Sequence, residues 1–214
     1  MGLYVVGITG GSGAVYGRRL LQALLFLKQD VKLVVSKAGQ RVLEIEEDLP
    51  FLPNDPERTP DWDAFLRSRE NGIPGQNLEV FDNGNLAAPI ASGSYRTDGM
   101  VVIPCSMGAL ARITTGVSSS LIERAADVTL KERRKLLLVP RETPLSLIHL
   151  RNMVSITEAG AEVLPAAPSF YHRPSSVNDL VDSIVSRILD RLDIDHGLSQ
   201  RWTGSVMSER ITRE

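Results

Sequence analysis

A glycine-rich stretch near the N-terminus is the first place where the sequence predicts chemistry. Thr9-Gly10-Gly11-Ser12-Gly13-Ala14 follows a β-branched run and precedes an amphipathic one. In a strand-loop-helix unit, backbone N–H groups at the start of the helix can hold a phosphate. The spacing does not match a dinucleotide fingerprint, a P-loop or a Gly-x-Ser-x-Gly elbow. We therefore predict a mononucleotide-type phosphate loop with Ser12 as its hydroxyl; the alternative is a glycine turn made only for tight strand-helix packing.

Two other segments carry polar groups directly after apolar runs. Cys105-Ser106-Met107-Gly108-Ala109 follows the run 100–104, and Arg141-Glu142 follows the run 136–140. Cys105 is either a nucleophile or, as we favour, a small buried residue. Thr143-Pro144 is typical of a helix start, which leaves Arg141 and Glu142 at the strand end. These two residues form either a structural ion pair or an anion-binding arginine beside a proton-handling glutamate.

Further charged and phenolic residues lie in the second half of the chain. The stretch 123–134 is dense in charge, as is typical of a solvated helix face. Phe170-Tyr171-His172-Arg173-Pro174 places a phenol and a cation after the last predicted strand, where they suit phosphate binding. The three histidines share no metal-ligand spacing and the chain has one cysteine, so we expect no metal site.

The elements that must position these groups alternate between strands and helices. Apolar runs predict strands at 3–9, 31–36, 100–104 and 136–140, with a weaker one at 163–167. Helical patterns occupy 16–25, 37–47, 117–133, 144–159 and 176–192. Continuous apolar strands between helices indicate a parallel sheet covered on both faces. We predict an α/β fold, a doubly wound Rossmann-like or flavodoxin-like sheet in a single domain over residues 1–194, with ligands beyond the carboxyl ends of the strands.

Two segments fall outside this alternation. Residues 48–77 are rich in proline and charge, and we predict a surface insertion there with a short helix at 61–69. Residues 195–214 form a polar tail with Trp202, which we expect to be disordered or docked on a neighbouring molecule.

Composition excludes several classes of protein. The 214 residues hold 24 Lys and Arg against 26 Asp and Glu, and this balance lacks the basic excess of a nucleic-acid binder. There is no apolar run of about 18 residues, so we expect no membrane span. The N-terminus lacks a basic leader, which makes a cytoplasmic location the default expectation. With five Phe, four Tyr and two Trp, one chain has few rings to sandwich a flat ligand.

Taken in order, the motifs resemble a known family. They are Thr-Gly-Gly-Ser-Gly-Ala-x-Tyr-Gly, Val-Ser-Lys-Ala, Ala-Ser-Gly-Ser, Pro-Cys-Ser-Met-Gly, Glu-Arg-Ala-Ala-Asp-Val-x-Leu-Lys-Glu-Arg-Arg, Pro-Arg-Glu-Thr-Pro and Phe-Tyr-His-Arg-Pro. This series is similar to that of the UbiX flavin prenyltransferases, of the flavoprotein superfamily that also holds the homo-oligomeric flavin-containing cysteine decarboxylases. The resemblance runs from about residue 3 to 202 and leaves out roughly 48–77.

The resemblance implies a specific reaction. Reduced FMN is alkylated at N5 by dimethylallyl phosphate, and the prenyl carbons then close a ring onto C6. The product, prenylated FMN, is passed to a UbiD-type decarboxylase. Older descriptions of the family name a 3-octaprenyl-4-hydroxybenzoate carboxy-lyase of ubiquinone biosynthesis. The resemblance also implies a homododecamer with flavin sites at subunit contacts and no requirement for a metal.

The matched positions imply the site residues. FMN would be contacted by Gly10, Gly11, Ser12, Ser36, Ser106, Met107, Gly108, Ala109 and Arg141. Dimethylallyl phosphate would be held by Tyr171 and Arg187, with Arg124 and Lys131 supplied by an adjacent subunit. Glu142 would give a proton to the phosphate and later take one from flavin C6, and Glu46 and Ser12 would assist. Lys131 would stabilise the leaving anion.

Some residues depart from the family pattern, and two other functions stay open. Gly11 stands where many members have Ala, and Leu86 stands where some relatives place a Trp against the prenyl site. A flavin-dependent cysteine decarboxylase of the same superfamily is one alternative, although its early catalytic histidine is missing here, where the first is His149. A non-enzymatic flavin carrier is the other, and it would leave Lys131 and Tyr171 unexplained.

Overall fold

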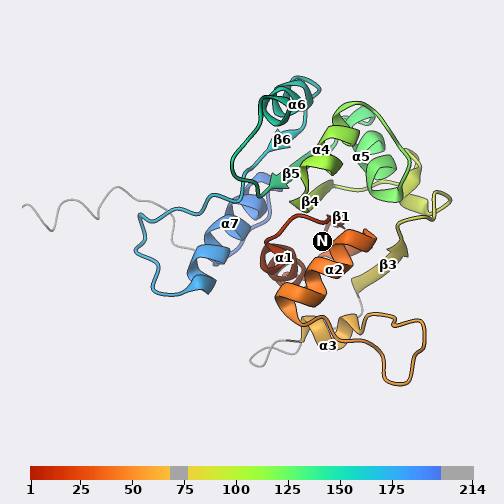
Figure 1. Ribbon diagram of the computed structural model, residues 1–214, viewed down its shortest axis with the longest axis vertical. Helices are drawn as coiled ribbons and strands as arrows, with labels where there is room; N and C mark the ends of the chain where they lie inside the picture. The colour runs from red at the N-terminus through yellow and green to blue at the C-terminus, as the bar shows by residue number, and fades with distance from the viewer. Residues whose placement is uncertain (68–76, 199–214) are drawn as a thin grey trace, which may run out of the picture. The chain divides into compact units, whose positions relative to one another are not determined.

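The computed structural model of the chain describes residues 1–67 and 77–198. The chain divides into two compact units, residues 1–167 and 168–214. The first unit carries the sheet and the second carries one long helix (Figure 1). The domain boundaries expected from the sequence, 1–194 and 195–214, stay a prediction.

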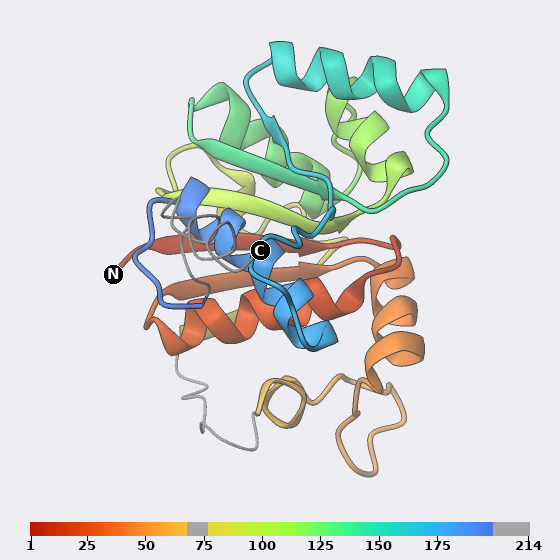
Figure 2. The ribbon, with the colours of Figure 1, turned by 90° about the vertical axis from the view of Figure 1, so that its left-hand side faces the viewer.

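The first unit is built on a six-stranded sheet in which all paired strands are parallel. The strands are β1 (Leu3–Ile8), β2 (Asp30–Val35), β3 (Leu78–Asp82), β4 (Gly99–Cys105), β5 (Lys135–Pro140) and β6 (Glu162–Val163). Their spatial order is β3-β2-β1-β4-β5-β6, and Figure 2 shows the strands lying side by side. This is the strand order of Rossmann sheets, so the predicted doubly wound α/β fold is confirmed.

Helices cover both faces of this sheet. The helical segments are α1 (Ala14–Phe26), α2 (Lys37–Glu47), α3 (Trp62–Leu66), η2 (Pro89–Ala91), α4 (Met107–Thr114), α5 (Leu121–Lys131) and α6 (Leu147–Glu158). A Cβ built on Gly7 would meet Ile122 of α5 at 3.3 Å, whereas one built on Gly17 of α1 would meet Ile8 at 3.4 Å. Because Gly7 and Ile8 are neighbours on β1 and point to opposite faces, α5 and α1 pack on opposite sides of the sheet.

The core explains why the central strands read as unbroken apolar runs. Every residue of β4 is buried. Val5, Met100, Val102, Leu136 and Leu138 pack with Ile122 and its neighbours in one cluster. The intervening Val6, Ile8, Val101 and Ile103 are also buried, on the opposite face. Strands buried on both faces cannot alternate between apolar and polar residues.

The predicted strands at 3–9, 31–36, 100–104 and 136–140 are confirmed to within a residue or two. The weaker strand expected at 163–167 is only Glu162–Val163. Two elements escape the sequence analysis, β3 and α4. The strand β3 lies at the sheet edge and buries no residue, so it lacks an apolar run. The helix α4 has only 8 residues, too few for a clear helical period.

The segment 48–67 is anchored to the first unit. Leu49, Phe65 and Leu66 are buried. From α1, the Arg18 guanidinium lies 4.9 Å from the centre of the Phe65 ring, and Gln22 Nε2 donates to the Leu66 carbonyl at 3.4 Å. The short helix predicted at 61–69 is found at Trp62–Leu66. That this stretch is an insertion stays a prediction, and 68–76 lie outside the described residues.

The second unit contains α7 (Val177–Arg191), as the sequence period predicted for 176–192. Ser176 and Asp179 form a reciprocal capping box at its start. The apolar residues at helical spacing, Val181, Ile184, Val185, Ile188 and Leu189, are buried. Most of the polar tail expected from residue 195, including Trp202, lies outside the described residues.

Candidate functional site

The predicted site segments of the first unit gather at one edge of the sheet. Because β1, β2, β4 and β5 are parallel, their carboxyl ends lie along the same edge. The segments that leave this edge are 9–13, 36, 106–109 and 141–142. The strand order reverses direction between β1 and β4, which is where open α/β sheets bind ligands. The glycine loop and the Ser106–Ala109 segment therefore flank the expected crevice.

Close packing explains two glycines of the first loop, and backbone conformation explains a third. A Cβ on Gly10 would lie 2.6 Å from the Ala38 Cβ, and one on Gly11 would lie 3.3 Å from the Pro104 Cβ. Gly13 has a φ of 104°, in the region that favours glycine. The loop thus passes close to α2 and to the end of β4. The packing interpretation of these glycines holds whether or not the loop also binds a ligand.

The start of α1 is occupied by a carboxylate of the protein itself. Glu46 Oε2 accepts from the backbone N–H of Gly13 at 2.8 Å and of Ala14 at 2.9 Å. The prediction that the N–H groups of this helix start hold a phosphate is therefore wrong for these two donors. A phosphate placed there would be repelled by the Glu46 charge. The sequence could not show this, because Glu46 is more than thirty residues away along the chain.

Glu46 is also linked to Ser12 and Arg141. Burial by itself would raise the pKa of the Glu46 carboxyl. Hydrogen bonds from the Ser12 side chain and from the Ala14 and Gly13 N–H groups act in the opposite direction, as does the Arg141 charge. Together they outweigh burial, so the pKa of Glu46 is lowered. Arg141 Nε donates to the Ser12 carbonyl at 3.1 Å. The structure thus brings together Ser12, Glu46 and Arg141, three residues that the resemblance placed in one site.

The lowered pKa of Glu46 predicts a pH-dependent contribution to stability. A carboxyl whose folded pKa is depressed stabilises the fold above its unfolded pKa, which is near 4.5, and loses that contribution as the pH falls through the folded pKa. We expect Glu46→Gln to lower the free energy of unfolding at pH 7, and the difference from wild type to shrink below pH 4.5. Urea unfolding at several pH values measures it.

The matched control for this prediction is Glu158→Gln, which alters an exposed carboxylate at the last residue of α6. A difference between wild type and Glu46→Gln that stays constant down to pH 3 would contradict the proposed role of the Glu46 charge.

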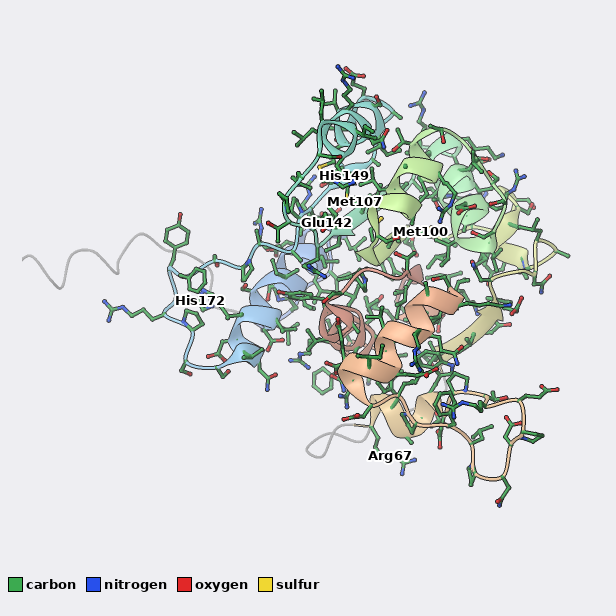
Figure 3. The ribbon with its side chains drawn as sticks, viewed as in Figure 1. Arg67, Met100, Met107, Glu142, His149 and His172 are labelled. Carbon is green, nitrogen blue, oxygen red and sulfur yellow. The ribbon has the colours of Figure 1, made fainter. Side chains whose placement is uncertain are left out.

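The starts of α2 and α4 offer further groups at this edge. Ser36 caps α2 by accepting from the Gly39 N–H at 3.0 Å, and Ser106 caps α4 by accepting from the Ala109 N–H at 3.3 Å. Each hydroxyl keeps its own proton for donation. Met107 and Ala109 are buried, whereas Gly108 is exposed. Figure 3 marks Met107 on the first turn of α4 and Glu142 after β5.

This donor set fits the polar parts of FMN. The hydroxyls of Ser36 and Ser106 and the guanidinium of Arg141 are the kinds of group that donate to a phosphate ester and to the edge of a flavin, whereas the Ser12 hydroxyl donates to Glu46 and keeps its oxygen as an acceptor. Within the described part of the chain, the N–H groups of Met107 and Gly108 at the start of α4 have no hydrogen-bond acceptor. They remain available to an anion at the α4 N-terminus.

Arg141 and Glu142 do not pair with each other in the described part of the chain. Arg141 bonds to Ser12, while Glu142 is exposed and its Oε1 accepts from the Thr143 N–H at 2.9 Å. The structural ion-pair interpretation is therefore wrong, and Glu142 is open to a ligand. The expected helix start at Thr143 is also wrong: α6 begins at Leu147, because Ser146 and His149 form the capping box.

Cys105 is the small buried residue that we favoured. The side chain is fully buried at the end of β4. Burial raises the pKa of its thiol to about 12, although a backbone hydrogen bond from Leu110 and the Arg112 charge act in the opposite direction. A thiol this far from ionisation is not a nucleophile at neutral pH.

Lys131 and Arg124 lie near opposite ends of α5. The helix α5 starts beside the carboxyl end of β3, where the Leu121 N–H donates to the Asn83 carbonyl at 2.8 Å, and it ends at Lys131, just before β5 begins. As the last residue of α5, Lys131 lies toward the amino edge of the sheet, and its Nζ donates to Glu132 at 2.9 Å. Arg124 lies seven residues earlier on the same helix face. One chain does not bring Lys131 to Glu142.

Tyr171 and Arg187 belong to the second unit. Tyr171 is exposed in the segment before α7. Arg187 is exposed on α7, with its Nη1 3.9 Å from the Asp190 carboxylate. Within this unit both side chains are accessible, as residues that contact a small phosphate must be.

Two side chains of the site escape the sequence analysis. Thr9, the first residue after β1, is 4% exposed and its hydroxyl bonds to both Pro104 and Ser106. Burial raises the pKa of the Tyr16 phenol, against the effect of the Arg141 charge. Both residues stand in the glycine motif, but only their partners in space show a role.

The absence of two further kinds of feature concerns the described ranges, 1–67 and 77–198. Neither a cluster of three or more metal-ligating side chains nor a helix long and apolar enough to cross a membrane is found there.

Comparison with known proteins places the chain in a family. The model of the Flavoprotein family matches residues 3–189. The flavin prenyltransferase UbiX of Synechocystis sp. is 46% identical over 205 residues, which cover 96% of this chain and 98% of that protein. The cysteine decarboxylase TvaF, at 14% identity and a TM-score of 0.56, shares the fold alone.

Solved structures agree with this placement. AnUbiX (PadA1), crystallised in complex with FMN and dimethylallyl pyrophosphate, superposes with a TM-score of 0.80 at 42% identity and covers 94% of this chain and 97% of its own. A dodecameric FMN-dependent UbiX-like decarboxylase from Escherichia coli O157:H7 has a TM-score of 0.79 at 41% identity, over 94% of this chain and 100% of its own. The chain therefore belongs to the Flavoprotein family and, within it, to the UbiX flavin prenyltransferases.

Proposed function

We propose that this chain transfers a dimethylallyl group from dimethylallyl phosphate to N5 and C6 of reduced FMN. The observation that carries this proposal is identity above 40% over almost the whole chain to proteins named flavin prenyltransferases, one of them crystallised with FMN and dimethylallyl pyrophosphate. The product is prenylated FMN, and we infer that a UbiD-type decarboxylase receives it.

FMN is held at the carboxyl ends of β1, β2, β4 and β5. Its partners are the groups that line this edge: Gly10, Gly11, Ser12, Ser36, Ser106, Met107, Gly108, Ala109 and Arg141. Reduced FMN supplies the nucleophilic N5 and C6 atoms. Arg141, fixed by its bond to the Ser12 carbonyl, presents its remaining N–H donors to the ligand. Glu46 fixes the Ser12 hydroxyl and the start of α1, which sets the position of the loop against the flavin.

Glu142 handles the protons. Breaking the bond between the allylic carbon and the phosphate oxygen leaves an allyl cation and a phosphate, and a proton from Glu142 helps the phosphate to depart. N5 loses its proton as it bonds to the allylic carbon. For the ring to close onto C6, the prenyl double bond must gain one proton, which balances the proton lost from N5 and makes the tertiary carbon electrophilic. C6 then bonds to that carbon and loses its own proton, which the Glu142 carboxylate accepts. The exposed position of Glu142 after β5 supports both roles.

The departing phosphate needs cations and hydrogen-bond donors. Tyr171 and Arg187 of the second unit supply a phenol and a guanidinium. Lys131 and Arg124 supply two further cations from an adjacent subunit. In support of this arrangement, α5 carries both residues on one face and ends at the amino edge of its own sheet.

The site is therefore completed by association of identical chains. The dodecameric neighbour from Escherichia coli supports a homo-oligomer, and we propose a dodecamer for this chain. Neighbouring chains also explain how a sequence with few aromatic rings encloses a flat ligand. We further propose a cytoplasmic location, where FMN and the allylic phosphate are available.

An anaerobic prenylation assay tests the function. The purified protein is mixed with FMN, dithionite and dimethylallyl phosphate, and the released flavin is analysed by mass spectrometry. We expect a flavin heavier by the mass of one C5H8 unit. Unmodified FMN as the only flavin after many turnover times, with protein that binds FMN, would overturn the proposed function and favour a flavin carrier.

A further inference from the structure

A buried threonine joins the two loops that follow β1 and β4. The Thr9 hydroxyl donates to the Pro104 carbonyl at 2.8 Å and accepts from the Ser106 N–H at 2.7 Å. The Thr9 N–H donates to the same Pro104 carbonyl at 3.2 Å. We name these three hydrogen bonds the Thr9 bridge. It connects residues more than ninety positions apart in the sequence.

The bridge lies where the regular pairing of the sheet stops. The register of β1 on β4 runs from Tyr4 opposite Gly99 to Gly7 opposite Val102. On its other side, β4 pairs with β5, and there its register is shifted by an irregularity between Val102 and Cys105. At an irregularity of this kind the ladder hydrogen bonds are interrupted. The Thr9 side chain therefore adds two bonds just beyond the last paired residues of β1 and β4, beside the backbone bond from Thr9 to Pro104.

Both ends of the bridge belong to the proposed FMN site. On one side, Thr9 leads directly into Gly10 and Gly11. On the other, Ser106 begins the Ser106–Ala109 segment and caps α4. The loops are also in contact, since a Cβ on Gly11 would lie 3.3 Å from Pro104 and 3.5 Å from the Ser106 nitrogen. With so little space between the loops, a small shift of one loop changes the positions of the groups that both loops present to a ligand.

We propose that Thr9 is a positioning residue of the FMN site: its hydroxyl fixes the glycine loop and the Ser106–Ala109 segment at the separation that the flavin requires. This inference rests on the proposed function, because it assumes that both segments bind FMN. Thr9 itself is 4% exposed, so it acts through these segments and not by touching the ligand.

The hydroxyl is the part of the side chain that matters. Valine has the same shape but leaves the Ser106 N–H without its acceptor, while the Pro104 carbonyl keeps the Thr9 N–H. Serine keeps the hydroxyl and loses only a methyl group. The pair Thr9→Val and Thr9→Ser therefore separates positioning by the hydrogen bond from packing of the side chain.

The test is a titration of the protein with oxidised FMN, followed by flavin fluorescence. We expect the Kd for FMN to rise about tenfold in Thr9→Val, which corresponds to about 1.4 kcal/mol, and to stay within about twofold of wild type in Thr9→Ser. The matched control is Thr129→Val. Thr129 is also buried, at 2% exposure, but its hydroxyl donates to the Ala125 carbonyl within α5.

Hydrogen exchange gives a second measurement. The Ser106 amide is expected to exchange faster in Thr9→Val than in wild type, Thr9→Ser or Thr129→Val. If Thr9→Val does not fold, Thr9→Ala removes the same hydroxyl without placing a methyl against polar groups, and the same results are expected.

The possible outcomes distinguish the positioning role of Thr9 from the proposed prenyltransferase function. FMN affinity and Ser106 exchange in Thr9→Val equal to wild type would overturn the positioning role while leaving the proposed function intact. An equal loss of FMN affinity in Thr9→Ser and Thr129→Val would also overturn it, because packing alone would then explain the effect. Wild-type protein that does not bind FMN would instead overturn the proposed function.

Discussion

Replacing Glu142 with glutamine is expected to slow prenylation about 100-fold or more while FMN binds as in wild type. The amide has nearly the shape of the carboxyl, but it neither gives a proton to the phosphate nor accepts one from C6. Glu142 is exposed and bonds only to the adjacent Thr143 N–H among the described residues, so its replacement should not disturb the fold.

Two measurements check this result, the anaerobic turnover rate and the Kd for oxidised FMN. Glu142→Asp is the companion variant, since it keeps a carboxyl one methylene farther from the ligand, and we expect an intermediate rate. Turnover of Glu142→Gln at the wild-type rate would remove Glu142 from the mechanism. A parallel loss of FMN affinity would instead make it a binding residue.

Lys131→Met is expected to lower the rate about 100- to 1,000-fold, because the departing phosphate loses a cation that stabilises it. Methionine keeps most of the aliphatic stem of the side chain, so the change removes mainly the charge. Lys28→Met, at an exposed lysine outside the proposed site, is the control, and we expect it to keep wild-type activity.

Mixed assemblies show which chain supplies Lys131. Within one chain, Lys131 lies toward the amino edge of the sheet and Glu142 at the carboxyl edge. If each site combines Glu142 of one chain with Lys131 of the next, co-expression of Lys131→Met with Glu142→Gln creates some sites with both native residues. For random mixing in equal amounts, about a quarter of the sites are intact, and activity should recover to that level.

No recovery in a co-purified mixed assembly would show that Lys131 and Glu142 act within one chain, which would contradict the proposed arrangement. The two variants purified separately and mixed without exchange of subunits provide the baseline. Recovery above that baseline cannot come from either variant alone, since each lacks one of the two residues.

The sequence predicts the architecture well because the central strands are buried on both faces. A strand such as β4, in which every residue is buried, must be a continuous apolar run, and such runs are visible without coordinates. The edge strand β3 buries no residue, so it leaves no apolar run in the sequence by which it could be predicted. The helix α4 is missed because its 8 residues make little more than two turns, too few to show a helical period in the sequence.

The exact start of a helix is also difficult to predict from the sequence alone. Thr143-Pro144 has the residue types of a helix start, yet α6 begins after Ser146. Several nearby residues are suitable caps, and the choice between them depends on which side chains meet. Ser146 and His149 satisfy each other's backbone groups, and this reciprocal contact decides the boundary.

The sequence by itself determined the fold class, the family and the residue types of the site. Apolar runs and ordered motifs depend only on the order of residues along the chain, so they can be recognised without coordinates. Only the tertiary structure decided which groups of the site form hydrogen bonds with one another. It placed the Glu46 carboxylate at the start of α1, where a phosphate was expected, and it separated Arg141 from Glu142. It also placed the Thr9 hydroxyl between Pro104 and Ser106. The physical reason is that a hydrogen bond depends on distance and direction in space, and residues tens of positions apart meet only after the sheet has formed.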